Sequence, residues 1–69
     1  KTPKDFGLTP REIELLGYIA QAWSYQKIAD QLFISHSTVR NHIHNIYKKI
    51  HVNSKAEAVQ LVMKNQWFK

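Results

Sequence analysis

The chain has 69 residues, and its ten Lys and Arg side chains against five Asp and Glu side chains give a formal net charge of +5. This length allows one domain with one small core, and the absence of cysteine excludes a disulfide framework and a thiolate metal site. A hydrophobic content of 43% excludes a disordered basic tail, and no apolar run approaches the ~20 residues of a membrane-spanning helix.

The charge is unevenly distributed along the chain. Residues 1–35 carry four basic and four acidic side chains, whereas residues 36–69 carry six basic side chains and one acidic side chain. All four histidines also lie in the second half. We therefore expect the second half to form a basic surface that binds an anionic partner.

Residues that interrupt regular structure are confined to the first quarter of the chain, where they are Pro3, Gly7, Pro10 and Gly17. Their absence from the rest predicts helices joined by short turns. Residues 1–7 are predicted to be a linker remnant, and residues 8–69 the folded domain. Because the chain begins with Lys rather than Met, we expect it to be part of a longer protein.

The first helix is predicted over residues 10–22. Thr9 can cap it, Pro10 fits the first helical position, and Glu12 stands where a capping box places its acid. An apolar stripe at helical spacing follows, and its residues are Ile13, Leu16, Ile19, Ala20 and Trp23.

Three further helices are predicted after this one. Ser24 can cap a short helix over residues 25–32, and Ser35 can cap a longer helix over residues 36–50. The Ser-Lys-Ala-Glu run that begins at Ser54 repeats the capping-box pattern and predicts a helix over residues 55–65. The sequence therefore predicts an all-α, compact four-helix domain.

The predicted helix over residues 36–50 has one apolar and one polar side. Its apolar side is formed by Val39, Ile43, Ile46, Tyr47 and Ile50, which recur at helical spacing. Its other side carries Ser37, Arg40, Asn41, His44 and Lys48. The apolar side is expected to pack on the core, and the polar side offers hydrogen-bond donors to a partner.

A short helix, a three-residue turn and this longer helix together predict a helix-turn-helix. An exposed helix fits the DNA major groove, where Arg pairs with guanine and Asn with adenine. We therefore expect double-stranded DNA as the partner, with base contacts from Arg40, Asn41 and His44. Phosphate contacts suit Ser37, Thr38 and Lys48. Lys49 lies beside this face and is expected to reach the DNA backbone at most.

The sequence also resembles the LuxR-type helix-turn-helix domain, which is the C-terminal output domain of NarL/FixJ response regulators and quorum-sensing regulators. The resemblance covers about residues 8–66 without a gap. It is carried by Leu8-Thr9-Pro10-Arg11-Glu12, Lys27-Ile28-Ala29, Ile34-Ser35, Ser37-Thr38-Val39-Arg40 and Lys55-Ala56-Glu57-Ala58-Val59. In this chain, Ala22 and His51 stand where the family usually has Gly. If Ala22 requires a positive φ, its turn is strained.

The resemblance implies specific positions for DNA contact and for pairing of two chains. Base contacts again fall on Arg40, Asn41 and His44. Backbone contacts fall on Ser24, Tyr25, Gln26, Thr38, His42 and Lys48. The resemblance implies that the fourth helix forms a dimer on inverted half-sites, through an interface predicted to contain Ser54, Glu57, Ala58, Leu61, Lys64 and Asn65. It also implies a two-component system in the cytoplasm, with an N-terminal regulatory domain, most often a phospho-receiver, outside this chain.

Other functions are less well supported by the sequence. His42 and His44 are two residues apart and point away from each other on a helix, so we expect no metal site. No Asp lies near a His in the sequence to orient it, so we expect no catalytic residue. We also expect no cofactor. A helical protein-protein interaction module is the main alternative, and a basic amphipathic membrane binder is a third. The polar helix face offers Arg, Asn, Ser and His rather than the apolar anchors that such a module uses.

Overall fold

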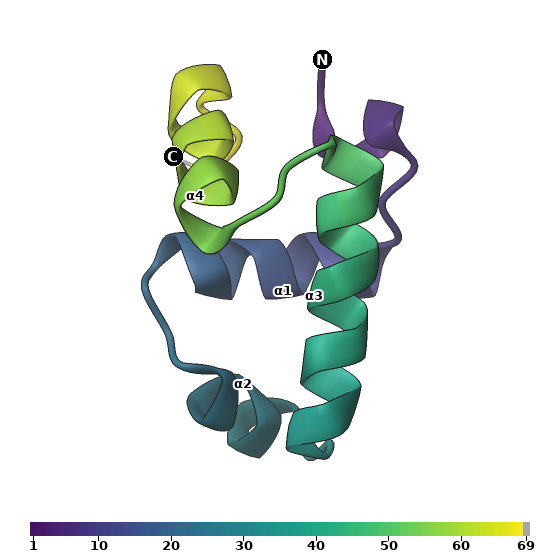
Figure 1. The fold of residues 1–69 in the computed structure, drawn as a ribbon, viewed down its shortest axis with the longest axis vertical. Coiled ribbons are helices and arrows are strands. Elements are labelled where there is room, and N and C mark those ends of the chain that lie inside the picture. Colours follow the sequence, from purple (N-terminus) through teal and green to yellow (C-terminus); the bar gives the residue numbers. More distant parts are fainter. Residues whose placement is uncertain (69) are drawn as a thin grey trace.

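The computed structural model describes residues 1–68. Within them the chain forms four α-helices and no strand, which confirms the predicted fold class. The helices are α1 (Pro10–Ala20), α2 (Tyr25–Leu32), α3 (His36–Ile50) and α4 (Lys55–Asn65) (Figure 1). A short 3₁₀-helix, η1 (Pro3–Phe6), precedes them and was not predicted. The bounds of α2, α3 and α4 agree with the predicted ranges.

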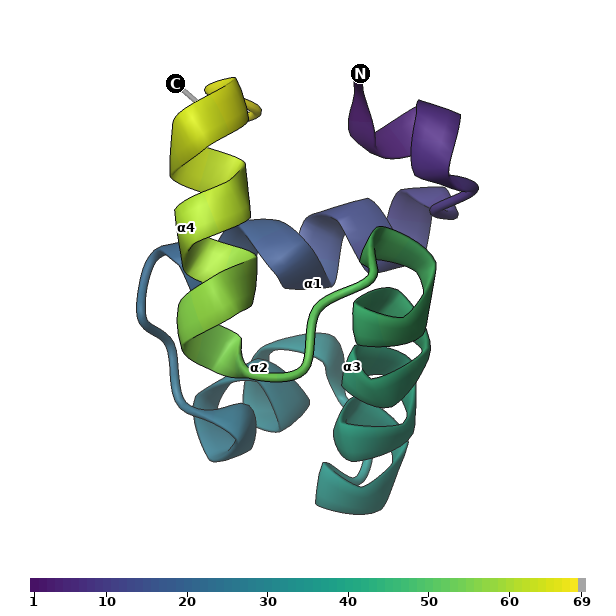
Figure 2. The ribbon, with the colours of Figure 1, turned by 45° about the horizontal axis from the view of Figure 1, so that its top comes forward.

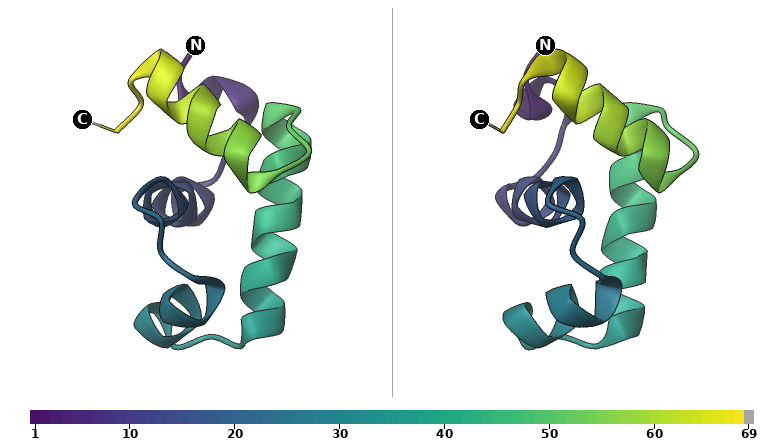
Figure 3. Two further views of the ribbon diagram at one scale, coloured as in Figure 1. Left: turned by 60° about the vertical axis from the view of Figure 1, so that its left-hand side comes forward. Right: turned by 90° about the vertical axis from the view of Figure 1, so that its left-hand side faces the viewer.

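The helices are arranged around α3, which is the longest. Figure 3 shows α4, α1 and α2 stacked along one side of α3, with α1 in the middle. The helix α1 packs against both α3 and α4, and α2 packs against α3. Figure 2 shows that the other side of α3 has no helix over it. This arrangement leaves one long face of α3 open.

The core lies where these four helices meet. Its largest fully buried side chains are Leu15, Leu16, Ile19, Ile28, Val39 and Ile46. Leu15 lies outside the predicted helical stripe, yet it is completely buried. The reason is that α1 is covered by two neighbours rather than one, so its buried face is wider than a single-sided stripe.

Helix α1 is shorter than predicted, because it ends at Ala20 rather than at residue 22. Ala22 has a φ of 66°, and this left-handed conformation turns the chain out of the helix. Trp23 therefore lies beyond the helix end, where its ring stacks on Tyr18 at a centroid distance of 4.3 Å. The ammonium of Lys27 lies 4.3 Å from the centre of the Trp23 ring.

Replacing Ala22 with Gly is expected to stabilise the domain by about 1 kcal/mol. The left-handed conformation costs an L-residue with a Cβ roughly 1–2 kcal/mol, and the greater freedom of Gly in the unfolded chain takes back part of this gain. Urea unfolding of Ala22→Gly at pH 7 measures the difference. Ala20→Gly is the matched control and is expected to destabilise, because Ala20 is helical.

The turn of the helix-turn-helix also begins with a residue in the left-handed conformation. Phe33 ends α2 with a φ of 56°, and its amide donates back to the Asp30 carbonyl. This conformation directs the Phe33 side chain away from the core, so that it is 94% exposed. Ile34 turns inward and packs against the core. His51 ends α3 in a left-handed conformation as well, with a φ of 61°.

The two ends of the described chain pack together at one end of the molecule. The Trp67 ring contacts Phe6 edge to face at a centroid distance of 5.5 Å, and its indole N–H donates to the Lys1 carbonyl over 2.7 Å. The ring of Phe68 packs against Gly17, where an added Cβ would lie 3.5 Å from it. Trp67 thus packs against the core, whereas Phe68 lies over Gly17 and remains 39% exposed.

Candidate nucleic-acid interface

The orientation of α3 is fixed by a cap at its start and a core stripe along its length. The Ser35 hydroxyl accepts from the Thr38 amide over 3.0 Å, and the two side-chain oxygens lie 2.8 Å apart. Every fourth or third residue from Val39 onward is buried, through Ile43 and Ile46 to Ile50. Because both anchors hold the same helix, its opposite face is presented in a defined direction.

That opposite face carries a shallow depression lined by Ser37, Arg40, Asn41 and His44. All four side chains are exposed. The three residues predicted to contact bases therefore lie together, and Ser37 joins them although it was assigned to the DNA backbone. The depression offers a guanidinium, an amide, an imidazole and a hydroxyl within one helix face, which is a set suited to donor and acceptor groups on base edges.

Two cations on or near this face are free of acidic partners. Within residues 1–68, the ion pairs are Arg11 with Glu14 and Lys49 with Glu12. Arg40 and Lys48 take part in neither, and both side chains are exposed. Their charges are therefore available to an external anion.

The start of α2 holds the three residues predicted to contact the DNA backbone there. Ser24 caps the helix by accepting from the Lys27 amide over 3.1 Å. The Gln26 amide nitrogen donates to the Asp30 carboxylate over 2.9 Å. Tyr25 is half-buried, and its ring centroid lies 6.0 Å from that of His36 at the start of α3. Ser24 and Gln26 already have local partners, so a contact with DNA would add to these bonds or replace them.

Thr38 and His42 occupy more enclosed positions than the residues of the depression. Both are half-buried, and the Thr38 hydroxyl is already engaged with Ser35. They flank the exposed face, where they have less surface to offer to DNA than Arg40 or Asn41.

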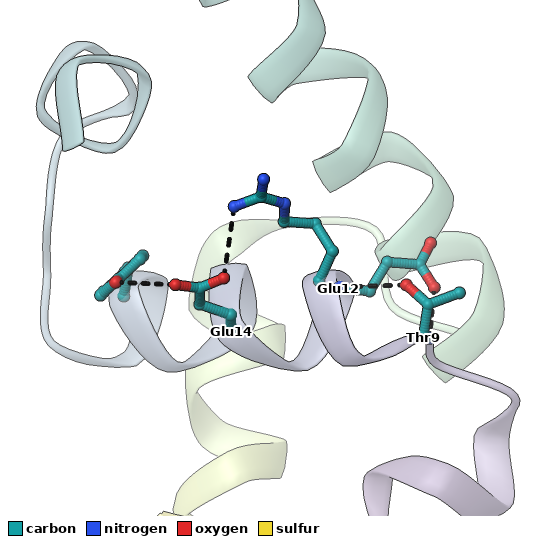
Figure 4. Close-up of polar contacts among 5 residues, drawn as sticks. Thr9, Glu12 and Glu14 are labelled. Atoms are coloured by element: carbon teal, nitrogen blue, oxygen red, sulfur yellow. Dashed lines mark hydrogen bonds and ion pairs between the residues drawn. The ribbon is translucent and has the colours of Figure 1, made fainter. Parts of the chain in front are cut away.

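Lys49 has a structural partner that the sequence did not reveal. Its ammonium lies 2.7 Å from a carboxylate oxygen of Glu12 at the start of α1. Glu12 is only 5% exposed. Its carboxylate also accepts a hydrogen bond from the Thr9 backbone amide, and the backbone amide of Glu12 donates to the Thr9 hydroxyl. Figure 4 shows the Thr9 and Glu12 side chains meeting at this cap, with Glu14 further along the helix. Lys49 is thus engaged in an internal ion pair, which reduces the charge that it can offer to DNA.

The protonation of Glu12 reflects the same contacts. Burial raises the pKa of the Glu12 carboxyl, but the hydrogen bond and charge of Lys49 and the bonds from Thr9 outweigh burial, so the pKa lies below its ordinary value. Glu12 is thus held as a carboxylate that joins the start of α1 to the end of α3.

The exposed side of α4 contains most of the residues predicted for the dimer interface. A second depression is lined by Val52, Glu57, Gln60, Leu61 and Lys64. Ser54 caps α4 by accepting from the Glu57 amide over 3.2 Å, and the Asn65 amide nitrogen donates to the Leu61 carbonyl over 2.9 Å. Ala58 is completely buried in the core of its own domain. Ala58 is therefore removed from the predicted interface, because it has no surface to give to a second chain.

Two features of residues 1–68 bear on the other functions. No group of three or more His, Cys, Asp or Glu side chains is placed to hold a metal ion in this part of the chain. No helix within the same residues has the length and apolar character needed to cross a membrane.

The fold and the exposed face of α3 define a helix-turn-helix domain. The sequence profile of the family described as "Bacterial regulatory proteins, luxR family" matches residues 7–62. The chain belongs to this family, as the resemblance predicted.

Individual relatives agree with this assignment. The chain is 42% identical over 62 residues to the transcriptional regulatory protein DegU of Brevibacillus brevis, which covers 90% of this chain and 26% of DegU. It is 40% identical over 53 residues to the HTH-type transcriptional regulator MalT of Vibrio cholerae, covering 77% of this chain and 6% of MalT. It is 37% identical over 57 residues to the uncharacterized transcriptional regulatory protein YxjL of Bacillus subtilis, covering 83% of this chain and 26% of YxjL. The chain spans about a quarter or less of these relatives.

Proposed function

We propose that this chain is the DNA-binding output domain of a bacterial transcription regulator and that it recognises specific double-stranded sequences with α3 in the major groove. The observation that carries this proposal is the depression on α3, where Ser37, Arg40, Asn41 and His44 are exposed together. This face belongs to the second helix of a helix-turn-helix in a family of regulatory proteins. Helices of this kind place their exposed side chains against base edges.

The contacts divide into two kinds. Arg40, Asn41 and His44 contact base edges, with Ser37 at the rim of the same depression. Phosphate contacts, which set the register of the helix without selecting sequence, come from Lys48 and from the start of α2. Thr38 and His42 contribute backbone contacts from the flanks of α3.

Two copies of the domain bind one DNA site, each on one of two inverted half-sites, and they contact each other through α4. The surface for this contact is formed by Ser54, Glu57, Leu61, Lys64 and Asn65. Leu61 supplies apolar surface next to the charges of Glu57 and Lys64, so the opposite charges of two antiparallel copies can pair across a two-fold axis. A face of this size on one short helix supports only a weak dimer in the absence of DNA.

The whole protein would place an N-terminal regulatory domain, such as a receiver, before this chain. This proposal is consistent with the much greater length of the relatives, of which DegU and YxjL are about four times longer than the matched region. The protein would act in the cytoplasm, where its DNA is, and would need no cofactor.

Titration with salt tests the proposed function and separates it from a protein-binding module. DNA binding is expected to weaken steeply with salt, with a log-log slope of about 0.9 per phosphate contacted. The variant Lys48→Ala should reduce this slope by about 1 and weaken all DNA sequences to a similar extent. Fluorescence anisotropy with a labelled duplex between about 50 and 300 mM KCl measures both the affinity and its salt slope.

The outcome that counts against DNA binding is an affinity for duplex that hardly changes with salt, which is the behaviour of a contact through apolar anchors. A loss in Lys48→Ala that is confined to one sequence would instead move Lys48 to the base contacts. Lys4→Ala is the matched control, because Lys4 is exposed on η1 and does not line the depression on α3.

The proposed dimer has its own test. Sedimentation of the isolated domain should show a monomer or a weak dimer, whereas a duplex with two inverted half-sites should bind two copies cooperatively. Leu61→Glu is expected to abolish the cooperativity and to leave binding to a single half-site within about twofold. Binding of one copy per palindromic duplex in the wild-type domain would contradict the dimer.

A further inference from the structure

Helix α4, which carries the proposed dimer surface, buries few of its own residues. Of its 11 residues only Ala58 and Val62 are buried, whereas α1, which has the same length, buries five. Ala58 and Val62 are small, so their burial contributes less hydrophobic stabilisation than the burial of larger side chains. The position of α4 therefore depends strongly on the contacts at its two ends.

Trp67 supplies the contact at the C-terminal end of α4. Gln66 ends the helix with a φ of 53°, and the Trp67 amide donates back to the Val62 carbonyl over 3.2 Å. This bond attaches Trp67 to the last turn of α4. The Trp67 ring meets Phe6 edge to face at 5.5 Å between centroids, and its indole N–H donates to the Lys1 carbonyl over 2.7 Å. One side chain thus makes an aromatic contact and a hydrogen bond with the segment before α1.

The segment that receives Trp67 is ordered by contacts of its own. The Thr2 amide donates to the Asp5 carboxylate over 2.8 Å at the start of η1. Gly7 ends η1 with a φ of 82°, and the next residue, Leu8, is buried in the core. Figure 3 shows η1 and α4 on the same side of α1. Trp67 therefore joins the end of α4 to a segment that is anchored in the core.

We propose that Trp67 is a positioning residue for the pairing of two copies, which acts by tying the end of α4 to η1. This inference rests on the proposed dimer. Leu61 and Lys64 lie in the last two turns of α4 and line its exposed depression, so the contacts of Trp67 fix the direction in which they face a second copy. Pairing weakens in proportion to the fraction of molecules in which this surface is correctly held.

The same contacts give the segment before α1 a role in pairing. Phe6 and Lys1 precede α1 in the chain, and they meet the end of α4 through the Trp67 ring. A displacement of this segment therefore acts on α4 without passing through α3. The proposed N-terminal regulatory domain, which would precede this segment, would have a route by which to alter pairing while leaving the DNA-binding face of α3 unchanged.

Trp67→Ala is expected to lower the cooperativity of binding to a duplex with two inverted half-sites by about three- to tenfold, because it removes both the aromatic contact and the hydrogen bond. The affinity for a single half-site should stay within about twofold, since no residue of the DNA-binding face is changed. Fluorescence anisotropy with a two-site duplex and a one-site duplex measures the two affinities, and their ratio gives the cooperativity.

Phe6→Ala tests the same contact from its other side. It should also lower cooperativity, and the double variant should lose little more than Trp67→Ala alone, because both substitutions remove one shared contact. Trp67→Phe keeps an aromatic ring at this position and loses the indole N–H, so it should retain part of the cooperativity that Trp67→Ala loses.

The competing explanation is that Trp67 only adds stability to the domain. Its loss would then lower the thermal unfolding midpoint and leave the cooperativity of the folded molecules unchanged. Tyr18→Leu is the matched control, because it removes a half-buried aromatic ring that stacks on Trp23. It should lower the unfolding midpoint and leave the ratio of two-site to one-site affinity unchanged.

The positioning role is supported if Trp67→Ala and Phe6→Ala both lower cooperativity, if their effects do not add, and if Tyr18→Leu leaves it unchanged. It is overturned, with the proposed dimer intact, if Leu61→Glu abolishes cooperativity and both clasp variants, Trp67→Ala and Phe6→Ala, retain it. It is also overturned if their losses add, or if they lose binding to a single half-site to the same extent. If the wild-type domain binds the two-site duplex without cooperativity, the proposed dimer fails and the positioning role fails with it.

Discussion

Arg40→Ala is expected to weaken binding to the preferred DNA sequence by about 1–3 kcal/mol, or roughly 5- to 150-fold, and to relax the preference at one base position. Arg40 is exposed in the depression on α3, and its guanidinium is free of the ion pairs found among residues 1–68. A guanidinium in this position can donate two parallel hydrogen bonds to O6 and N7 of a guanine, which no other base pair accepts in the same way.

The measurement begins with selection of bound sequences from a random DNA pool by the wild-type domain. The selected site, and versions of it changed at each position, are then titrated with both proteins. If specific and nonspecific DNA weaken equally in Arg40→Ala, Arg40 contacts no base. Arg11→Ala is the matched control, since it removes the same type of charge from α1, where Arg11 pairs with Glu14 at 3.3 Å.

Lys49→Met is expected to destabilise the domain by about 1–3 kcal/mol at pH 7. The substitution keeps the aliphatic stem but leaves the Glu12 carboxylate buried without its cation. Removing one partner of a fully buried pair typically costs ~3–5 kcal/mol. The estimate here is lower because the Lys49 side chain is 36% exposed and water partly screens the pair. Urea unfolding monitored by circular dichroism measures the loss.

The same interaction predicts a dependence on pH. The folded-state pKa of Glu12 is lowered, so its contribution to stability is present above the ordinary carboxyl pKa of about 4.3. It is lost as the pH falls through the lower pKa of the folded state. The difference in stability between the wild type and Lys49→Met should therefore shrink below about pH 4. A difference that stays constant from pH 7 to pH 3 would mean that Lys49 acts through packing alone.

Lys48→Met is the matched control for Lys49→Met, and the two neighbours should behave in opposite ways. Lys48 is exposed, so its replacement should change stability by less than about 0.5 kcal/mol while it lowers the salt slope of DNA binding. Lys49→Met should lower stability and leave the salt slope unchanged at temperatures where the variant is folded. These opposite effects on stability and salt slope distinguish Lys48, a cation that contacts DNA, from Lys49, a cation that holds α3 in place.

The helices were predictable from the sequence because their signals are local. Thr9, Ser24, Ser35 and Ser54 each cap a helix through a bond to an amide three residues later, and such bonds are encoded in adjacent residues. The apolar stripe of α3 was predictable for the same reason, and it left Arg40, Asn41 and His44 on the opposite face. The end of α1 was placed two residues too late. Only the usual Gly of the family at position 22 pointed to a left-handed turn there, because Ala itself carries no local signal for a positive φ.

The role of each charged or polar side chain depended instead on contacts between distant segments. Lys49 and Glu12 are separated by 37 positions, and only the packing of α3 across α1 brings them together. That contact pairs the charge of Lys49 inside the domain, although its side chain stays 36% exposed. Likewise only the packed structure leaves Ala58 with no exposed surface, whereas Leu61 is half-buried and lines the depression on α4.

The sequence by itself determined that the chain forms a helix-turn-helix domain with its excess charge in the second half, because caps, periodicity and composition are properties of short segments. The tertiary structure decided how that charge is used. Arg40 and Lys48 remain free on α3, whereas Lys49 is neutralised by a buried carboxylate. The Tyr47 hydroxyl is buried without a hydrogen-bond partner among residues 1–68. The physical reason is that the energy of a charge or a hydroxyl is set by burial and by its nearest partners, and these are fixed only when distant segments pack.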